Sequence, residues 1–122
     1  MKTEDIMYLD YRKEENKEII QKALRKIKAF SKFEEGTEVP LEELEKGVFY
    51  LTNKYKLEPQ WITMGFKACD KNILYSVSLK TSDTYKWLGS VYGKCVYELF
   101  AKLVIKMYSE IKVNKIEKRN GE

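Results

Sequence analysis

The sequence contains no histidine, and this absence limits the chemistry that its side chains can do. Histidine is the usual general base near neutral pH, the most common neutral metal ligand and the activator of many serine and cysteine nucleophiles. The two cysteines, Cys69 and Cys95, have no second cysteine near either of them, so the spacing of a zinc site is missing. We expect both to be buried small hydrophobic residues without a disulfide.

The acidic residues do not form a recognisable catalytic pair. Asp70 and Asp83 flank a predicted strand and therefore lie at its opposite ends. The acidic stretch from Glu34 to Glu45 surrounds a predicted helix start, where carboxylates stabilise the positive end of the helix dipole. We therefore expect a protein that is not an enzyme and uses neither a metal nor another cofactor. An enzyme in which Asp or Glu binds magnesium is the remaining alternative.

The glycines at positions 89 and 93 form a Gly-x-x-x-Gly motif. A phosphate-binding loop needs more glycines and a lysine followed by Ser or Thr, and these are missing here. We interpret Gly89 and Gly93 as a loop and a close packing point at the start of the last helix.

The stretch from Thr81 to Tyr92 is the best candidate for a functional surface, because it mixes aromatic residues with lysines in a hydroxyl-rich segment. Such a mixture suits stacking on a nucleic-acid base or a hot spot for a protein partner. The alternative is that Trp87 and Leu88 cover the end of the core. The predicted partner-binding residues are Tyr85, Lys86, Trp87, Tyr92 and Lys80, together with Trp61 and Lys67.

Two helices precede this surface in the chain. Apolar residues at steps of three and four predict a helix from about Asp10 to Phe33 that is buried along one side. A second helix begins with Pro40 in its first turn, and the stretch from Lys56 to Pro59 ends it. Its predicted core residues are Leu41, Leu44, Val48, Leu51 and Tyr55.

Alternating apolar residues predict a hairpin of two strands, Trp61–Ala68 and Ile73–Lys80. Trp61 and Lys67 belong to the face that points away from the core, and so do Ser76, Ser78 and Lys80. A lone hairpin is marginally stable. We therefore expect a third strand at residues 85–88, or a second protomer that extends the sheet, and favour the third strand.

Residues 91–113 carry an apolar surface wider than one helical stripe. This pattern predicts a long C-terminal helix that is largely buried, or buried on two sides, and its breadth leads us to expect a homodimer. The tail of residues 114–122 has no apolar pattern, so we expect it to fray.

Composition places these elements in one domain of residues 1–122, since 43% of the 122 residues are hydrophobic and 34% are charged. The predicted class is α+β, with a small antiparallel sheet, a hairpin or three strands, packed against two or three helices. No apolar run reaches the ~18 residues that span a bilayer, and the N-terminus is charged, so we expect a cytoplasmic protein without a membrane partner. The net charge of +4 is concentrated in residues 46–122, either as a solvated lysine-rich surface or as a surface for phosphate or an acidic protein.

The order helix, strand, strand, polar loop, helix between Pro40 and Val113 resembles the small α-β-α sandwich proteins of bacteriophages and prophages. The matching features are the amphipathic Leu41–Leu44 helix start, the Trp61 strand and the Thr81–Thr84 loop before an apolar final helix. The resemblance implies an accessory protein of a mobile element, without a defined activity. We expect a binding protein whose partner is a host protein or protein complex, for example as an inhibitor of a host defence system. Nucleic-acid binding and sequestration of a small nucleotide-like ligand are the alternatives.

Overall fold

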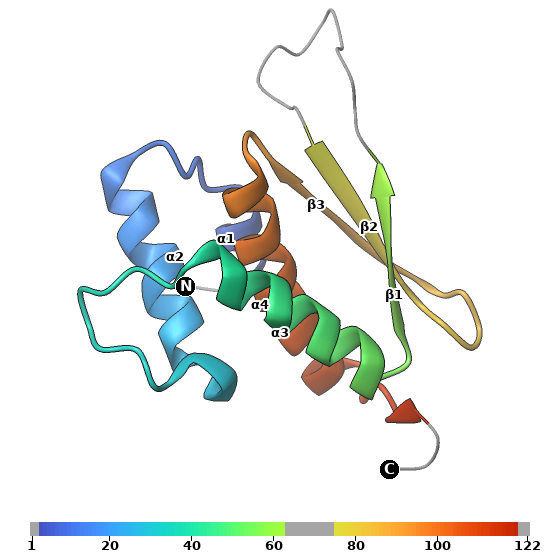
Figure 1. Cartoon of the computed structure of the whole chain (residues 1–122). Helices are drawn as coiled ribbons and strands as arrows, with labels where there is room; N and C mark the ends of the chain where they lie inside the picture. The colour runs from blue at the N-terminus through green and yellow to red at the C-terminus, as the bar shows by residue number, and fades with distance from the viewer. Residues whose placement is uncertain (1–2, 63–74, 120–122) are drawn as a thin grey trace, which may run out of the picture.

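The computed structural model describes residues 3–62 and 75–119, and its helices and strands form the predicted α+β class (Figure 1). The elements in chain order are α1 (Thr3–Met7), α2 (Glu14–Lys26), the 3-10 helix η1 (Lys28–Phe30), α3 (Leu41–Lys54), β1 (Leu57–Ile62), β2 (Tyr75–Thr81), β3 (Trp87–Gly93) and α4 (Val96–Val113). The predicted third strand and the long C-terminal helix are both confirmed.

The sheet has the strand order β1-β2-β3, and both neighbouring pairs are antiparallel. One face of the sheet is buried against the helices, with α4 against β2 and β3 and with α3 against β1. The fully buried residues Leu57, Val77, Leu79 and Val91 belong to this face. Figure 1 shows the helices on one side of the sheet, so its other side is left open by the described helices.

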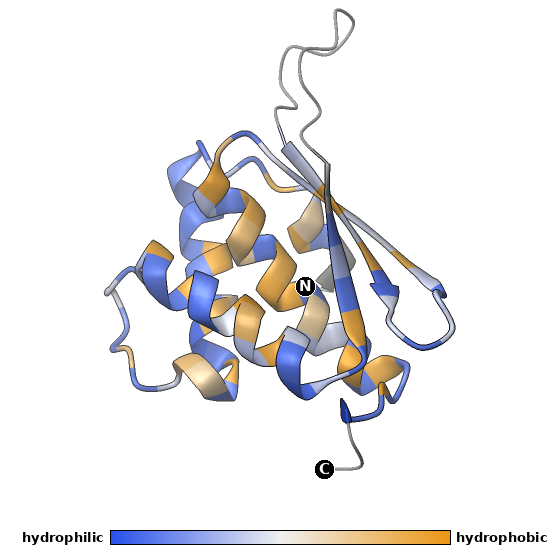
Figure 2. Cartoon of the chain, turned by 45° about the vertical axis from the view of Figure 1, so that its right-hand side comes forward, coloured by the Kyte–Doolittle hydropathy of each residue, from blue (hydrophilic) through white to orange (hydrophobic). Residues whose placement is uncertain are grey.

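Helix α4 is the centre of the core, because α1, α2, α3 and the sheet all pack on it. Its buried residues are Glu98, Leu99, Ala101, Lys102, Leu103, Val104, Ile105 and Met107. Figure 2 shows apolar residues gathered in the middle of the helical layer and polar residues on its outer turns. The predicted burial of this helix on two sides is confirmed. Since the chain itself covers this broad apolar surface, the surface gives no argument for a homodimer.

The first predicted helix is shorter than expected, and the second is confirmed. Helix α2 ends at Lys26 because Ile27 is extended, with φ −76° and ψ 129°, and Phe30 then enters the core from η1. The short helix α1 was not predicted. Helix α3 begins directly after Pro40, and three of its five predicted core residues are buried, namely Leu44, Val48 and Leu51.

Strand β1 corrects the predicted hairpin, because it begins at Leu57, within the stretch that was predicted only to end a helix. Pro59 is tolerated there because β1 is an edge strand, where a missing N–H need not break the ladder. The backbone register places Trp61 opposite Val77, whereas the prediction grouped position 61 with Ser76, Ser78 and Lys80. The predicted strand residues 63–68 and 73–74 lie outside the described residues, and so does Cys69.

Residues 91–93 end strand β3, although they were predicted to begin the last helix. Gly93 allows the tight turn into α4, because a Cβ atom there would lie 2.8 Å from the backbone nitrogen of Leu99. This confirms the predicted close packing point, whereas the predicted loop is wrong because Gly89 and Gly93 both lie within β3. Cys95 then acts as the N-cap, and its Sγ accepts the Glu98 N–H at 3.4 Å. Cys95 is exposed, so the prediction that it is buried was wrong.

The tail is docked and not frayed through residue 119. Ile116 packs against the core, and the carbonyl of Glu117 accepts the N–H of Lys56 at 2.9 Å. Arg119 donates to the carbonyls of Thr52 at 2.7 Å and Leu57 at 2.9 Å. The sequence pattern missed these contacts because they are polar bonds between segments far apart in the chain.

Candidate partner-binding surface

The open face of the sheet has a small polar centre with an aromatic side chain at one end. The register places Ser76 opposite Tyr92 and Ser78 opposite Ser90. The Oγ atoms of Ser78 and Ser90 lie 3.1 Å apart in a hydrogen bond across the two strands. Tyr92 is 41% exposed. Ser76 is only 5% exposed, whereas Ser78 and Ser90 are half-buried, so this face presents a tyrosine ring near one pair of serine hydroxyl groups.

A β-bulge brings Trp87 to the same face. Leu79 pairs with Gly89 but Lys80 pairs with Trp87, so Leu88 is an extra residue in β3. Without this bulge, the alternation of the strand would turn Trp87 towards the helices. Leu88 packs against the core, whereas Trp87 is 68% exposed. Leu88 therefore covers the end of the core, and the Trp87 ring is exposed to solvent.

Tyr85 extends the aromatic surface into the turn between β2 and β3. Its φ of 57° is rare for a bulky residue, and hydrogen bonds to Thr81 hold this conformation. The Thr81 carbonyl accepts the Tyr85 N–H at 3.1 Å, and the Thr81 Oγ1 accepts the Lys86 N–H at 2.9 Å. The Nζ of Lys80 lies 5.2 Å from the centre of the Tyr85 ring. Tyr85 is 66% exposed, so the turn presents its ring to solvent.

Strand β3 also has a free edge among the described residues, because it is the outer strand of the sheet on this side. An edge strand presents unpaired backbone N–H and C=O groups that can pair with another chain. A hollow of about 250 Å³ lies beside this edge, and its lining includes Tyr8, Trp87, Tyr92 and Lys106. Tyr8 is 85% exposed and follows directly after α1. The sequence pattern missed Tyr8 because α1 is too short to show a helical periodicity.

We call this area the outer sheet surface and define it by Tyr8, Lys80, Tyr85, Trp87, Ser90 and Tyr92. It brings together four of the seven predicted partner-binding residues, whereas Lys86 lines another hollow with Leu88 and residues 114–117. Trp61 lies opposite Val77 in the register of β1 and β2, and Lys67 lies outside the described residues.

The outer sheet surface carries little excess charge. Lys80 pairs with Glu58 at 4.0 Å, and the neighbouring Lys94 pairs with Asp10 at 3.0 Å. Lys86 is exposed and takes part in none of the salt bridges of the described residues. Binding to nucleic acid requires a continuous row of cations along a phosphate backbone. Two of these three lysines already have a carboxylate partner.

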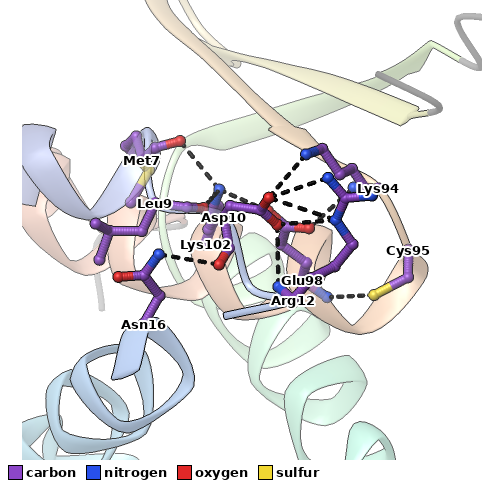
Figure 3. A network of polar contacts seen from close by, with 9 residues as sticks. All are labelled: Met7, Leu9, Asp10, Arg12, Asn16, Lys94, Cys95, Glu98 and Lys102. Carbon is purple, nitrogen blue, oxygen red and sulfur yellow. Dashed lines mark hydrogen bonds and ion pairs between the residues drawn. The ribbon is translucent and has the colours of Figure 1, made fainter. Parts of the chain in front are cut away.

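A buried polar network fixes Tyr8 and the end of β3 relative to α4 (Figure 3). Lys102 is 3% exposed, and its ammonium group donates to the Met7 carbonyl at 3.1 Å and to the Leu9 carbonyl at 2.6 Å. It also binds the Glu98 carboxylate at 2.8 Å. Because Met7 and Leu9 flank Tyr8, this one ammonium group holds the chain on both sides of that residue.

Asp10 extends the network to the turn between β3 and α4 (Figure 3). Its carboxylate accepts hydrogen bonds from the Arg12 side chain and backbone and from Lys94, and these bonds hold the pKa of Asp10 well below its usual range. The backbone N–H of Lys94 donates to Glu98 at 3.0 Å. The position of β3 is thus fixed by charged groups that are already paired with one another.

Among residues 3–62 and 75–119, no group of three or more His, Cys, Asp or Glu side chains is arranged to hold a metal ion. In the same ranges, each helix is too short or too polar to cross a membrane.

Comparisons of the chain with protein-family models, curated proteins and solved structures find no match.

Proposed function

We propose that this protein is a non-catalytic binding protein that docks a protein partner on the outer sheet surface. The observation that carries the proposal is that exposed aromatic side chains meet beside an unpaired strand edge. Tyr8, Tyr85 and Trp87 are each more than half exposed, and Tyr92 is 41% exposed. A host protein is the partner that we propose, as the resemblance to phage accessory proteins implies.

The aromatic residues support a protein partner for an energetic reason. Tryptophan and tyrosine are enriched among the residues whose loss costs at least ~2 kcal/mol of binding energy. Trp87 is turned to solvent by a bulge, while the neighbouring Leu88 is packed in the core. The hydrophobic effect alone would favour the opposite arrangement, in which the larger ring of Trp87 is buried and Leu88 is exposed.

The strand edge supports an extended segment of the partner as the docking element. Strand addition to a free edge gains backbone hydrogen bonds, and pockets for alternate side chains give specificity. The hollow next to Tyr8 and Trp87 can take one such side chain. The paired state of Lys80 and Lys94 favours this partner over nucleic acid.

The experiment is a quantitative capture from a host lysate with immobilised wild type and two variants. Trp87→Ala removes a ring that is 68% exposed on the outer sheet surface, and Phe49→Ala removes one that is 67% exposed on α3. We expect a protein that binds to wild type and to the Phe49→Ala control but binds about 30-fold more weakly to Trp87→Ala.

Two results would contradict the proposal. Identical captured proteins for both variants would show that the outer sheet surface does not dock the partner. Captured material that nuclease removes would instead favour nucleic-acid binding.

A further inference from the structure

Residues of α2 and α4 line a groove. Figure 1 shows α2 on the side of α4 that faces away from the sheet. The volume of the groove, about 840 Å³, exceeds the 250 Å³ of the hollow beside β3. The apolar residues that line the groove include Ile19, Ala23 and Ile27 on the side of α2, and Ile105 and Ile111 on the side of α4. They form its floor. Four of these apolar side chains, Ile19, Ala23, Ile27 and Ile111, are only half-buried, so the chain leaves part of this apolar surface exposed to water.

The rim of this groove is formed by lysines from both walls. Lys22, Lys26 and Lys28 belong to the first wall, and Lys112 belongs to the second. In the described part of the chain, none of these four takes part in a salt bridge, and no acidic residue lines the groove. By contrast, Lys106 on α4 is paired with Glu110 at 3.3 Å. We call the feature the lysine-rimmed groove.

The unpaired charge on both walls argues for a ligand with many carboxylates. A fatty acid carries a single carboxylate and would satisfy one lysine at one end. An amphipathic helix presents an apolar stripe with acidic residues on both sides of it, which matches a floor and two rims. The 13 residues of α2 span roughly 20 Å, which suits a partner helix of three to four turns.

We propose that the lysine-rimmed groove binds an acidic amphipathic helix of a protein partner. This site is separate from the outer sheet surface, and the two can be occupied at the same time. The proposal does not depend on what binds to β3.

The test measures fluorescence anisotropy of a labelled synthetic helix, about four turns long, with leucine on one face and glutamate on the other. A peptide with lysine in place of glutamate and a scrambled acidic peptide are the ligand controls. The groove variant is Lys22→Glu/Lys26→Glu, and Lys112→Glu tests the opposite wall independently. The matched control is Lys13→Glu/Lys115→Glu, which reverses two exposed charges outside the groove.

We expect the acidic amphipathic peptide to bind to wild type and to the control variant with equal affinity. Both groove variants should bind it at least about 10-fold more weakly, because like charges across an interface repel. Circular dichroism of each variant confirms that it is folded.

Four results would overturn the proposal. The first is no binding of the acidic peptide at about 1 mM. The second is equal binding of the basic or scrambled peptide. The third is binding of anionic vesicles without binding of the peptide. The fourth is a wild-type dimer in sedimentation that the groove variants dissociate, since a second copy would then be the occupant.

Discussion

Replacing Lys102 by methionine tests the buried network that holds α1 against α4. The side chains of Lys102 and Glu98 are each 3% exposed and lie 2.8 Å apart. Methionine is similar in length but leaves the Glu98 carboxylate and the carbonyls of Met7 and Leu9 without the ammonium donor. Removing one partner of a buried ion pair costs about 3–5 kcal/mol. The whole domain is expected to be stable by only about 5–15 kcal/mol.

The assay is urea unfolding followed by circular dichroism, with Lys46→Met as the control. Lys46 is 64% exposed and pairs with Glu42 and Glu43 on α3, so its loss should cost less than about 1 kcal/mol. The double variant Lys102→Met/Glu98→Leu should be less destabilised than the sum of its single variants, because no buried charge is left unpaired. A loss below about 1 kcal/mol for Lys102→Met would refute the reasoning.

Three further predictions concern pH, packing and the exposed tryptophan. Because the pKa of Asp10 is lowered in the folded state, its charged side chain stabilises the fold fully at pH values above its ordinary pKa of 3.8. This stabilisation is lost as the pH falls from 3.8 through the lower pKa of the folded state. Thermal unfolding between neutral pH and strong acid should therefore show a smaller loss for Asp10→Asn than for wild type, and equal losses would contradict this. Gly93→Ala should cost about 1–3 kcal/mol in urea unfolding, because its Cβ would lie 2.8 Å from a backbone nitrogen, and an unchanged midpoint would disprove the close approach. Trp87→Ala should leave the free energy of unfolding within about 0.5 kcal/mol of wild type, because the ring is 68% exposed, and a larger loss would mean that the ring supports the fold.

The helices were the most predictable part of the fold. Helix α3 could be located from its period of buried residues and from Pro40 at its start. The long C-terminal helix was also found, but its start was placed too early. Val91 and Gly93 are buried in β3, and a short apolar run of this kind fits a helix start as well as a strand.

Strand β3 shows why local pattern was not enough. The bulge at Leu88 breaks the alternation of side chains, and Gly89 has a φ of 112°, so no regular strand pattern can be read from the sequence. Strand β1 was obscured in a different way, since Pro59 suggested a break where the sheet has an edge strand.

The candidate site was predictable by composition but not by geometry. Aromatic residues among lysines indicated the segment of Trp87 and Tyr92, and both are exposed on the outer sheet surface. Tyr8 joins them only through α1, which Lys102 ties to α4 across a long stretch of chain. The lysine-rimmed groove could not be predicted, because the sequence does not show that Lys22 and Lys26 border a groove with Lys112.

The most direct test of the central claim places a photo-crosslinking amino acid at position 87 in the host cell, with the same amino acid at position 49 as the control. Both native side chains are similarly exposed, at 68% and 67%. We predict a discrete protein adduct from position 87 that is absent from position 49 and is weakened by Tyr92→Ala. Equal adducts from both positions, or an adduct with nucleic acid alone, would contradict the account.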